Sequence, residues 1–256
     1  MDLELRHSLQ GLDSLTLSGG GRQVEFNLYE KRTLEVLATL WEKTAYHHRL
    51  THILEWMGVP ILQFAEDIVM MQELLWNLKP DVLVECGVAH GGSAIMYAAM
   101  MELAGKGRVI GVDVDIRPHT RENITRSPLS KRITLIEGNS VDPTVVAKVD
   151  GLIRAGESVV VALDSNHRRD HVKAELLAYK DLVSVGSYLV VMDTSSSYIH
   201  DVPSGNKEMI KDSALEAVQE FLSRSVEFSI DPHYNRLKIT SNVCGFLKKS
   251  TTSSQR

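Results

Sequence analysis

The chain has 256 residues, of which 43% are hydrophobic and 24% charged, as in an ordinary globular protein rather than a disordered or collagen-like one. Its 28 lysines and arginines against 33 aspartates and glutamates give a net charge of −5, which argues against a nucleic-acid-binding protein. The two cysteines exclude a disulfide framework and a four-cysteine zinc site.

The sequence shows no feature of membrane insertion or export. No apolar run approaches the roughly 20 residues that are needed to span a bilayer. The first ten residues, MDLELRHSLQ, lack the positive and apolar regions of a signal peptide. We therefore expect a cytoplasmic protein that has no membrane partner.

The N-terminal part is expected to be an arm followed by helices. Residues 1–25 show no periodicity and contain a flexible break at 18–21. Apolar residues recur at helical spacing within 29–57 and predict a helix there. These residues are Leu34, Leu37, Leu40 and Trp41. A second helix is predicted over 65–78.

From residue 81 onwards, short apolar runs alternate with helical segments. The runs at 81–86, 108–112, 133–136, 158–163 and 188–192 predict strands, and 92–103, 144–155, 169–182 and 213–222 predict helices. Two more strand-like runs occupy 237–240 and 245–247. Because strands that alternate with helices form βαβ units, the sequence predicts an α/β fold with a parallel sheet covered on both faces.

The residues that follow each strand are candidates for a functional site, because ligands of open α/β sheets bind at the carboxyl ends of the strands. Glu85 lies at the end of the first strand, and Gly87 allows a tight turn after it. Gly91 lets a ligand approach the following helix N-terminus, and Asp113 suits the two hydroxyls of a ribose. The later strands are followed by Asn139 and Ser140, by Asp164 and His167, and by Asp193.

Several of these residues also have a purely structural interpretation. The glycine loop could be an ordinary strand-to-helix turn, and Asp113 and Asp193 could be turn residues. Asp164 could cap the following helix. His167 could be a solvated residue of the first helical turn.

Other conspicuous residues are expected at the surface or in the core. His171, His200 and Asp201 are interpreted as surface residues. The pairs Met70–Met71 and Met100–Met101 are interpreted as core filling. The segment after the fifth strand has no clear periodicity, and a long loop in that place is more often functional than decorative.

Five motifs in order resemble the class I S-adenosylmethionine-dependent methyltransferases. These motifs are ECGVAHGGS, VIGVDVD, EGNSVD, ALDSNH and VVMDT. More narrowly, the chain resembles the cephalosporin hydroxylase family, which includes rhamnosyl O-methyltransferases, over about residues 55–248. The resemblance implies a Rossmann-like, doubly wound, mostly parallel sheet with an antiparallel C-terminal strand. We assign this domain to residues 58–250 and an N-terminal arm and helical extension to residues 1–57.

The resemblance also implies roles for individual residues. S-adenosylmethionine would be bound by the glycine loop and the polar strand ends, at Glu85, Gly87, Gly91, Ser93, Asp113, Asn139, Ser140 and Asp164. Asp164 and Asp193 would bind Mg²⁺ or another divalent cation, and His167 would be the general base. Met192 departs from the pattern, because several metal-dependent sugar methyltransferases have an acid there and a thioether is a poor Mg²⁺ ligand.

The predicted function is O-methylation of a hydroxyl on a small natural product or sugar, since a hydroxyl needs a base, a metal or both to react. The arm and the apolar helix predict a homo-oligomer. An NAD(P)-dependent oxidoreductase is one alternative, but the E-x-G-x-x-x-G spacing disfavours it. A non-catalytic partner protein of the same fold is the other, and Met192 is the residue in its favour.

Overall fold

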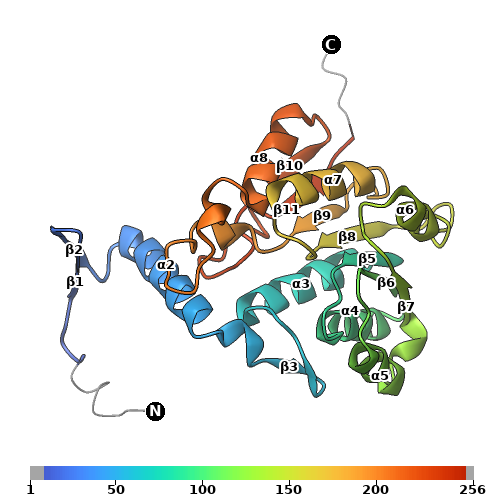
Figure 1. Ribbon diagram of the computed structural model, residues 1–256, viewed down its shortest axis with the longest axis horizontal. Helices are drawn as coiled ribbons and strands as arrows, with labels where there is room; N and C mark the ends of the chain where they lie inside the picture. The colour runs from blue at the N-terminus through green and yellow to red at the C-terminus, as the bar shows by residue number, and fades with distance from the viewer. Residues whose placement is uncertain (1–8, 252–256) are drawn as a thin grey trace.

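A seven-stranded sheet forms the centre of the protein in a computed structural model that describes residues 9–251 (Figure 1). Its strands are β5 (Val82–Cys86), β6 (Arg108–Asp113), β7 (Ile133–Glu137), β8 (Val159–Leu163), β9 (Tyr188–Val191), β10 (Phe228–Ile230) and β11 (Phe246–Lys249). Their order in the sheet is β10-β11-β9-β8-β5-β6-β7. The strands from β5 to β9 are parallel, and β11 is antiparallel to both of its neighbours. The predicted fold, with its antiparallel C-terminal strand, is confirmed.

Helices cover both faces of this sheet, as its apolar strands require. One face carries α3 (Ala65–Leu78), α4 (Gly92–Leu103) and α5 (Pro118–Arg126). The other face carries α6 (Pro143–Asp150), α7 (Arg169–Tyr179) and α8 (Ala214–Arg224). Every residue of β5 and β8 is buried, which explains why neither strand alternates apolar and polar residues.

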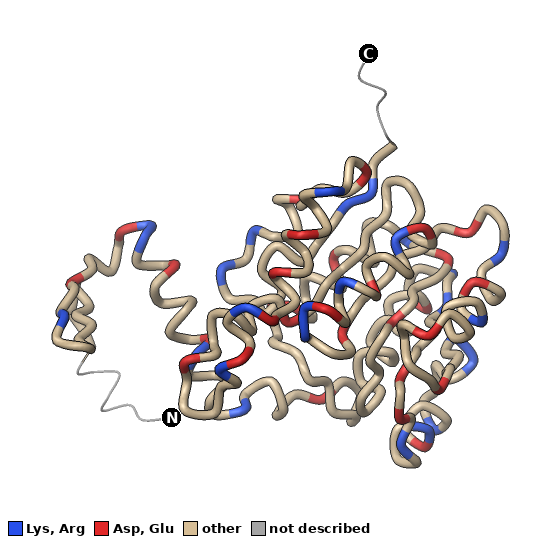
Figure 2. Tube along the Cα trace, turned by 45° about the horizontal axis from the view of Figure 1, so that its top comes forward, with Lys and Arg blue, Asp and Glu red and all other residues tan. Residues whose placement is uncertain are grey.

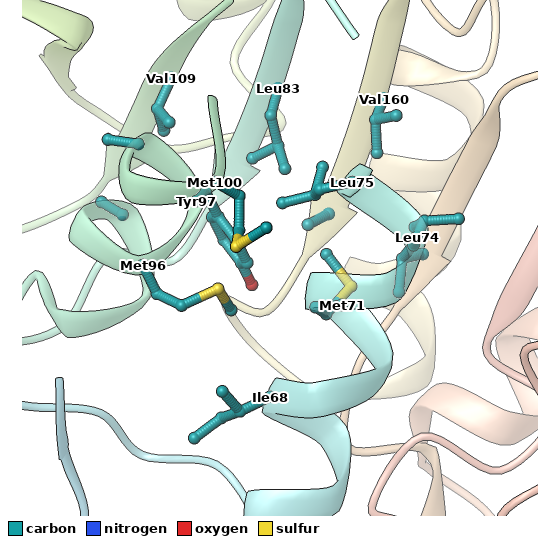
Figure 3. Close-up of a cluster of buried hydrophobic side chains, with 14 of the residues drawn as sticks. Ile68, Met71, Leu74, Leu75, Leu83, Met96, Tyr97, Met100, Val109 and Val160 are labelled. Carbon is teal, nitrogen blue, oxygen red and sulfur yellow. The ribbon is translucent and has the colours of Figure 1, made fainter. Parts of the chain in front are cut away.

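The core between α3, α4 and the sheet is rich in methionine. Figure 3 shows Met71 of α3 and Met96 and Met100 of α4 in this layer, with Leu83 of β5 on the sheet side. Methionine is flexible and fills irregular gaps between helices. The interpretation of the two methionine pairs as core residues is confirmed, since all four side chains are buried.

The prediction of a strand over 237–240 is wrong. The edge strand is β10, at 228–230, and the 237–240 segment leaves the sheet. Its polar groups contact helices instead, because Lys238 pairs with Glu35 and the Thr240 hydroxyl donates to the Asp67 carboxylate. Two other predicted elements are shorter than expected, since α6 ends at Asp150 and α7 at Tyr179.

The N-terminal extension is more ordered than predicted. Strands β1 (Ser14–Gly19) and β2 (Arg22–Asn27) form an antiparallel hairpin, and the flexible break is its turn. Gly20 and Gly21 have φ values of 56° and 74°, as a tight hairpin turn between two strands requires. The first eight residues of the predicted arm lie outside the described residues.

Helix α2 (Lys31–His47) connects this hairpin to the main domain. Its predicted apolar side does not pack on that domain. Leu34, Leu37 and Trp41 are exposed, whereas the buried residues are Thr33, Ala38, Glu42 and Ala45. Figure 1 shows the hairpin and the start of α2 projecting from the body of the protein. The short helix η1 (Leu50–His52) and the paired strands β3 (Glu55–Trp56) and β4 (Val59–Pro60) lead from α2 into α3.

The surface charges are mixed in sign. Figure 2 shows lysines and arginines interspersed with acids along the trace. Within the described residues, no helix is both long and apolar enough to cross a membrane.

Candidate active site

A cavity of about 440 Å³ lies at the carboxyl ends of the central strands. One side is formed by the glycine loop after β5, including Gly87, His90 and Ser93. The acids Asp164 and Asp193, which follow β8 and β9, lie on its floor. The rest of the lining comes from α2, η1, residues 60–64, the segment after β9 and Ser241. The position at the strand ends is the one expected for a ligand site in this class of sheet.

The glycine loop is packed so closely that side chains are excluded at two positions. Gly87 has φ of 98°, and a Cβ atom there would lie 2.0 Å from the carbonyl oxygen of Asp164. A Cβ atom on Gly92 would lie 2.3 Å from the carbonyl oxygen of Pro60. Gly87 therefore allows the loop after β5 to pack against the end of β8. Gly92 allows the start of α4 to pack against the segment before α3. Gly91 is the N-cap of α4, and Ser93 lies in its first turn.

Glu85 is a buried acid whose charge is not compensated. Its side chain is fully buried, and neither carboxylate oxygen has a hydrogen-bond partner among the described residues. Burial raises the pKa of Glu85 to about 8; the nearby Asp113 charge adds to this shift and the Ser93 hydroxyl opposes it. Glu85 is not among the residues that line the cavity.

Asp113 lies beside the glycine loop, as predicted. Its Oδ2 accepts hydrogen bonds from the backbone N–H groups of Val88 (2.8 Å) and Ala89 (3.0 Å). Its Oδ1 accepts from the N–H of Asp115 at 3.1 Å. The carboxylate therefore holds the end of β6 against the loop. A carboxylate has about four lone-pair positions, so it retains capacity for a ligand hydroxyl.

A second group of polar residues joins the ends of β7 and β8 to α7. Ser140 and Ser165 both donate to Oε1 of the fully buried Glu175. Nε2 of His171 lies 3.2 Å from each of these hydroxyl oxygens. The prediction of a surface position for His171 missed this contact. Asn139 is exposed and accepts a hydrogen bond within its own turn, from Val141 N–H at 3.2 Å.

The predicted metal and base residues come together after β8 and β9. One potential ligand atom from each of Asp164, His167 and Asp193 lies within 4.8 Å of the others. Nε2 of His167 is 3.3 Å from Oδ2 of Asp193. The alternative that His167 belongs to the first turn of a helix is wrong, because α7 begins only at Arg169. Asp164 is also not a helix cap, since Arg168 holds that position.

The electrostatics of this group favour a bound cation. Burial, followed by the charges of Asp193 and Glu85, raises the pKa of Asp164 well above its ordinary range. Within residues 9–251, no lysine or arginine lines the cavity to balance these acids. The Asp164 and Asp193 carboxylates are suitable ligands for a divalent cation, and the cation would stabilise the ionised form of Asp164.

Gln63 is a partner of Asp164 that the strand-end argument did not identify. Its Nε2 lies 3.4 Å from Oδ2 of Asp164 and 3.3 Å from Sδ of Met192. Met192 is buried, and its sulfur contacts this amide. At position 192, the thioether of Met192 therefore contacts the Gln63 amide where several metal-dependent sugar methyltransferases have an acid.

Asp67 of α3 fixes the chain segment that holds Asp193. Its buried carboxylate accepts hydrogen bonds from the Thr240 hydroxyl, from Ser241 N–H at 2.9 Å and from the Ser241 hydroxyl at 2.8 Å. The next residue, Asn242, uses its Oδ1 to accept from the backbone N–H of Asp193 at 3.0 Å. Asp193 has a left-handed backbone with φ of 53°, which costs a non-glycine residue about 1–3 kcal/mol. The surrounding hydrogen bonds must hold it there.

The wall opposite the glycine loop is built from two segments that are far apart in sequence. The segment after β9 contains η3 (Thr194–Ser197) and η4 (Lys207–Ile210). Helix α2 is fixed against it by the Lys43–Asp201 ion pair at 2.6 Å and by His47 Nδ1, 3.2 Å from the Ser204 hydroxyl. The expectation that the unpatterned segment is a functional loop agrees with this position, and Asp201 is at the surface as predicted.

The family model "Rhamnosyl O-methyltransferase/CmcI" matches residues 48–250. The chain belongs to this family. A Mycobacterium tuberculosis relative named rhamnosyl O-methyltransferase is 30% identical over 161 residues, which cover 61% of the chain and 59% of the relative. A relative of that name from Mycobacterium leprae is 30% identical over 169 residues, which cover 64% of the chain and 70% of the relative. The chain thus spans about three fifths of the length of the first relative.

Solved structures of CmcI and of one other O-methyltransferase show the same fold. An apo structure of CmcI is 22% identical with a TM-score of 0.58, and the match covers 78% of this chain and 77% of CmcI. A CmcI structure with Mg and SAM is 21% identical with a TM-score of 0.58, and the match covers 78% of each chain. An O-methyltransferase from Bacillus cereus in complex with SAH is 15% identical with a TM-score of 0.53, and covers 79% of this chain and 84% of its own.

Proposed function

We propose that this family member is an S-adenosylmethionine-dependent O-methyltransferase that acts on a sugar or small natural-product hydroxyl. The observation that carries the proposal is the convergence of Asp164, His167 and Asp193 within 4.8 Å, on a cavity whose other side is the glycine loop. Two relatives are named rhamnosyl O-methyltransferase, and a structural neighbour contains Mg and SAM. These names support the chemistry and the class of acceptor.

The cofactor would lie along the glycine loop. S-adenosylmethionine would supply the methyl group as an electrophile on a sulfonium. Glu85, Gly87, Gly91 and Ser93 would hold its methionine part, and Asp113 would accept from its ribose hydroxyls. Asn139, Ser140 and Asp164 complete the cofactor set, with Asn139 and Ser140 beside the adenine. The free lone pair of Asp113 fits a ligand that brings a hydrogen-bond donor.

The acceptor hydroxyl would be activated on the other side of the cavity. Asp164 and Asp193 would hold Mg²⁺ or another divalent cation, whose charge would lower the pKa of a nearby hydroxyl. His167 would take the proton of the acceptor hydroxyl, and its Nε2 lies 3.3 Å from Oδ2 of Asp193. The Asp193 carboxylate would stabilise the imidazolium, so the base is oriented before the methyl group moves.

Methyl transfer with and without a chelator tests this proposal. The purified protein is supplied with radiolabelled S-adenosylmethionine and methyl α-L-rhamnopyranoside as a sugar probe. We expect turnover that EDTA abolishes and that Mg²⁺ restores. Full activity in EDTA would remove the metal from the proposal, and cofactor binding without any methyl transfer to hydroxyl acceptors would favour a non-catalytic partner protein.

The exposed side of α2 supports a homo-oligomer. Leu34 is 54% exposed and Trp41 46% exposed, on one helix face that no described residue covers. The adjacent β1–β2 hairpin is also largely exposed, and an isolated two-stranded hairpin is marginally stable in water. A second copy of the chain would cover both. Light scattering should report an oligomer that Trp41→Glu dissociates, whereas a monomeric wild type would contradict this inference.

A further inference from the structure

The acceptor side of the cavity contains a buried acid that the proposed chemistry does not use. Glu42 of α2 is 6% exposed and lines the cavity. Its recorded hydrogen bond, from Thr240 N–H to Oε1, is 3.4 Å long and therefore weak. Among the ion pairs of residues 9–251, none includes Glu42. A carboxylate this buried usually has a strong partner, so its best partner is expected to be a ligand.

The position of Glu42 is fixed by contacts outside the cavity. It shares the buried face of α2 with Ala38 and Ala45, which are small and let the helix lie close to the domain. The neighbouring residue Lys43 anchors the helix to Asp201, as described above. Tyr46, one helical turn after Glu42, also lines the cavity. The helix therefore presents two polar side chains to a ligand from a rigid element.

The charge of the cavity restricts what this ligand can be. The lining includes Glu42, Asp164 and Asp193 and, within the described chain, no lysine or arginine. Burial raises the pKa of Glu42 to about 7, the Thr240 N–H opposes this shift, and the charge of Asp67 adds to it. The described lining therefore offers no cationic side chain to pair with a phosphate or carboxylate group, whereas acceptor hydroxyl groups can donate to these acids.

The wall next to Glu42 also has unused hydrogen-bonding capacity. The hydroxyl groups of Ser196 and Ser197 are buried and have no partner among the described residues. Ser196 lines the cavity. A ligand with several hydroxyls matches such a wall, because each buried polar group that remains unpaired costs free energy.

We propose that Glu42 is a specificity-determining residue that accepts a hydrogen bond from a second hydroxyl of an uncharged, polyhydroxylated acceptor. This contact would orient the acceptor so that a different hydroxyl reaches His167. The inference rests on the proposed methyltransferase function. Sites that hydrogen-bond a substrate hydroxyl discriminate strongly against analogues that lack it.

The test compares KM and kcat of wild type, Glu42→Gln and Glu42→Ala for methyl α-L-rhamnopyranoside and for its monodeoxy analogues. We expect Glu42→Ala to raise KM for the parent sugar about tenfold, the loss typical of one hydrogen bond to a charged group. Glu42→Gln keeps an oxygen acceptor and should lose less. One deoxy analogue should be a poorer substrate than the parent sugar for wild type. For Glu42→Ala the same analogue should be no poorer than the parent sugar, because the missing hydroxyl and Glu42 would form a coupled pair.

Affinity for S-adenosylhomocysteine should be the same in all three proteins, and Glu30→Ala should behave as wild type. Glu30 is an exposed residue directly before α2 whose side chain makes no capping hydrogen bond. Suppose that the wild type methylates the sugar, that both Glu42 variants have the wild-type KM, and that the effect of each missing hydroxyl is the same in wild type and in the variants. The inference is then overturned, and the proposed function stands. If the wild type methylates none of these sugars, the sugar acceptor and this inference are overturned together. Should Glu42→Ala fail to fold, Glu42→Gln with the deoxy series decides.

Discussion

The two sides of the cavity are built in different ways. On the cofactor side, Asp113 at the end of β6 binds Val88 and Ala89 in the loop after the neighbouring strand β5, only 24 or 25 positions away. On the acceptor side, Asp67 binds Thr240 and Ser241 across 173 or 174 positions, and Glu42 contacts Thr240 across 198. The first side follows from the order of strands and glycines. The second depends on where distant segments happen to pack.

His167 should show the largest effect, because it would act in the chemical step alone. We expect His167→Ala to lower kcat by about 10²–10⁴-fold, the usual range for a positioned general base. The affinity for S-adenosylhomocysteine should be unchanged, because His167 would not contact the cofactor side of the cavity. His233→Ala is a suitable control, since His233 is exposed and pairs with Glu73 away from the cavity. A fall in kcat of less than about threefold in a pH–rate comparison would assign the base elsewhere.

Gly87 tests whether the cofactor side depends on close packing. A Cβ atom there would meet the Asp164 carbonyl at 2.0 Å in a backbone with φ of 98°. We expect Gly87→Ala to lower the free energy of unfolding by about 3 kcal/mol and to weaken cofactor binding. Gly105→Ala is matched in backbone, with φ of 75° but nothing within 4 Å, and should cost only about 1 kcal/mol. Equal melting temperatures for the two variants would contradict the packing argument.

Asp67 tests whether the acceptor side is held from a distance. Asp67→Ala removes the acceptor for Ser241 and so releases the segment that binds Asp193. We expect Mn²⁺ affinity, measured by calorimetry or electron paramagnetic resonance, to fall about 10–100-fold, as for other residues that support metal ligands. Asp67→Asn keeps an oxygen acceptor and should therefore lose less Mn²⁺ affinity than Asp67→Ala. Unchanged Mn²⁺ binding in both variants would show that Asp193 needs no such support.

The sequence located the polar residues at the strand ends but not the buried acids inside helices, for a physical reason. Gly87 and Asp113 stand at strand ends, and the parallel sheet brings strand ends together whatever lies between them. Asp164, His167 and Asp193 were found by the same argument. Glu42, Asp67 and Glu175 lie inside helices, where one acid resembles any other until tertiary packing buries it. The Leu34–Trp41 stripe predicted the helix but not its exposure, since periodicity shows that a face is apolar but not what covers it.

The most direct test of the account is calorimetric titration of wild type and Asp113→Ala with S-adenosylhomocysteine and with NAD⁺. The account predicts that the wild type binds S-adenosylhomocysteine and gives no signal with NAD⁺. Asp113→Ala removes the hydrogen-bond acceptor beside the glycine loop and should weaken S-adenosylhomocysteine binding by about 1–3 kcal/mol. Tight binding of NAD⁺, or the same S-adenosylhomocysteine affinity in both proteins, would contradict the assignment of this side of the cavity to the methyl-donor cofactor.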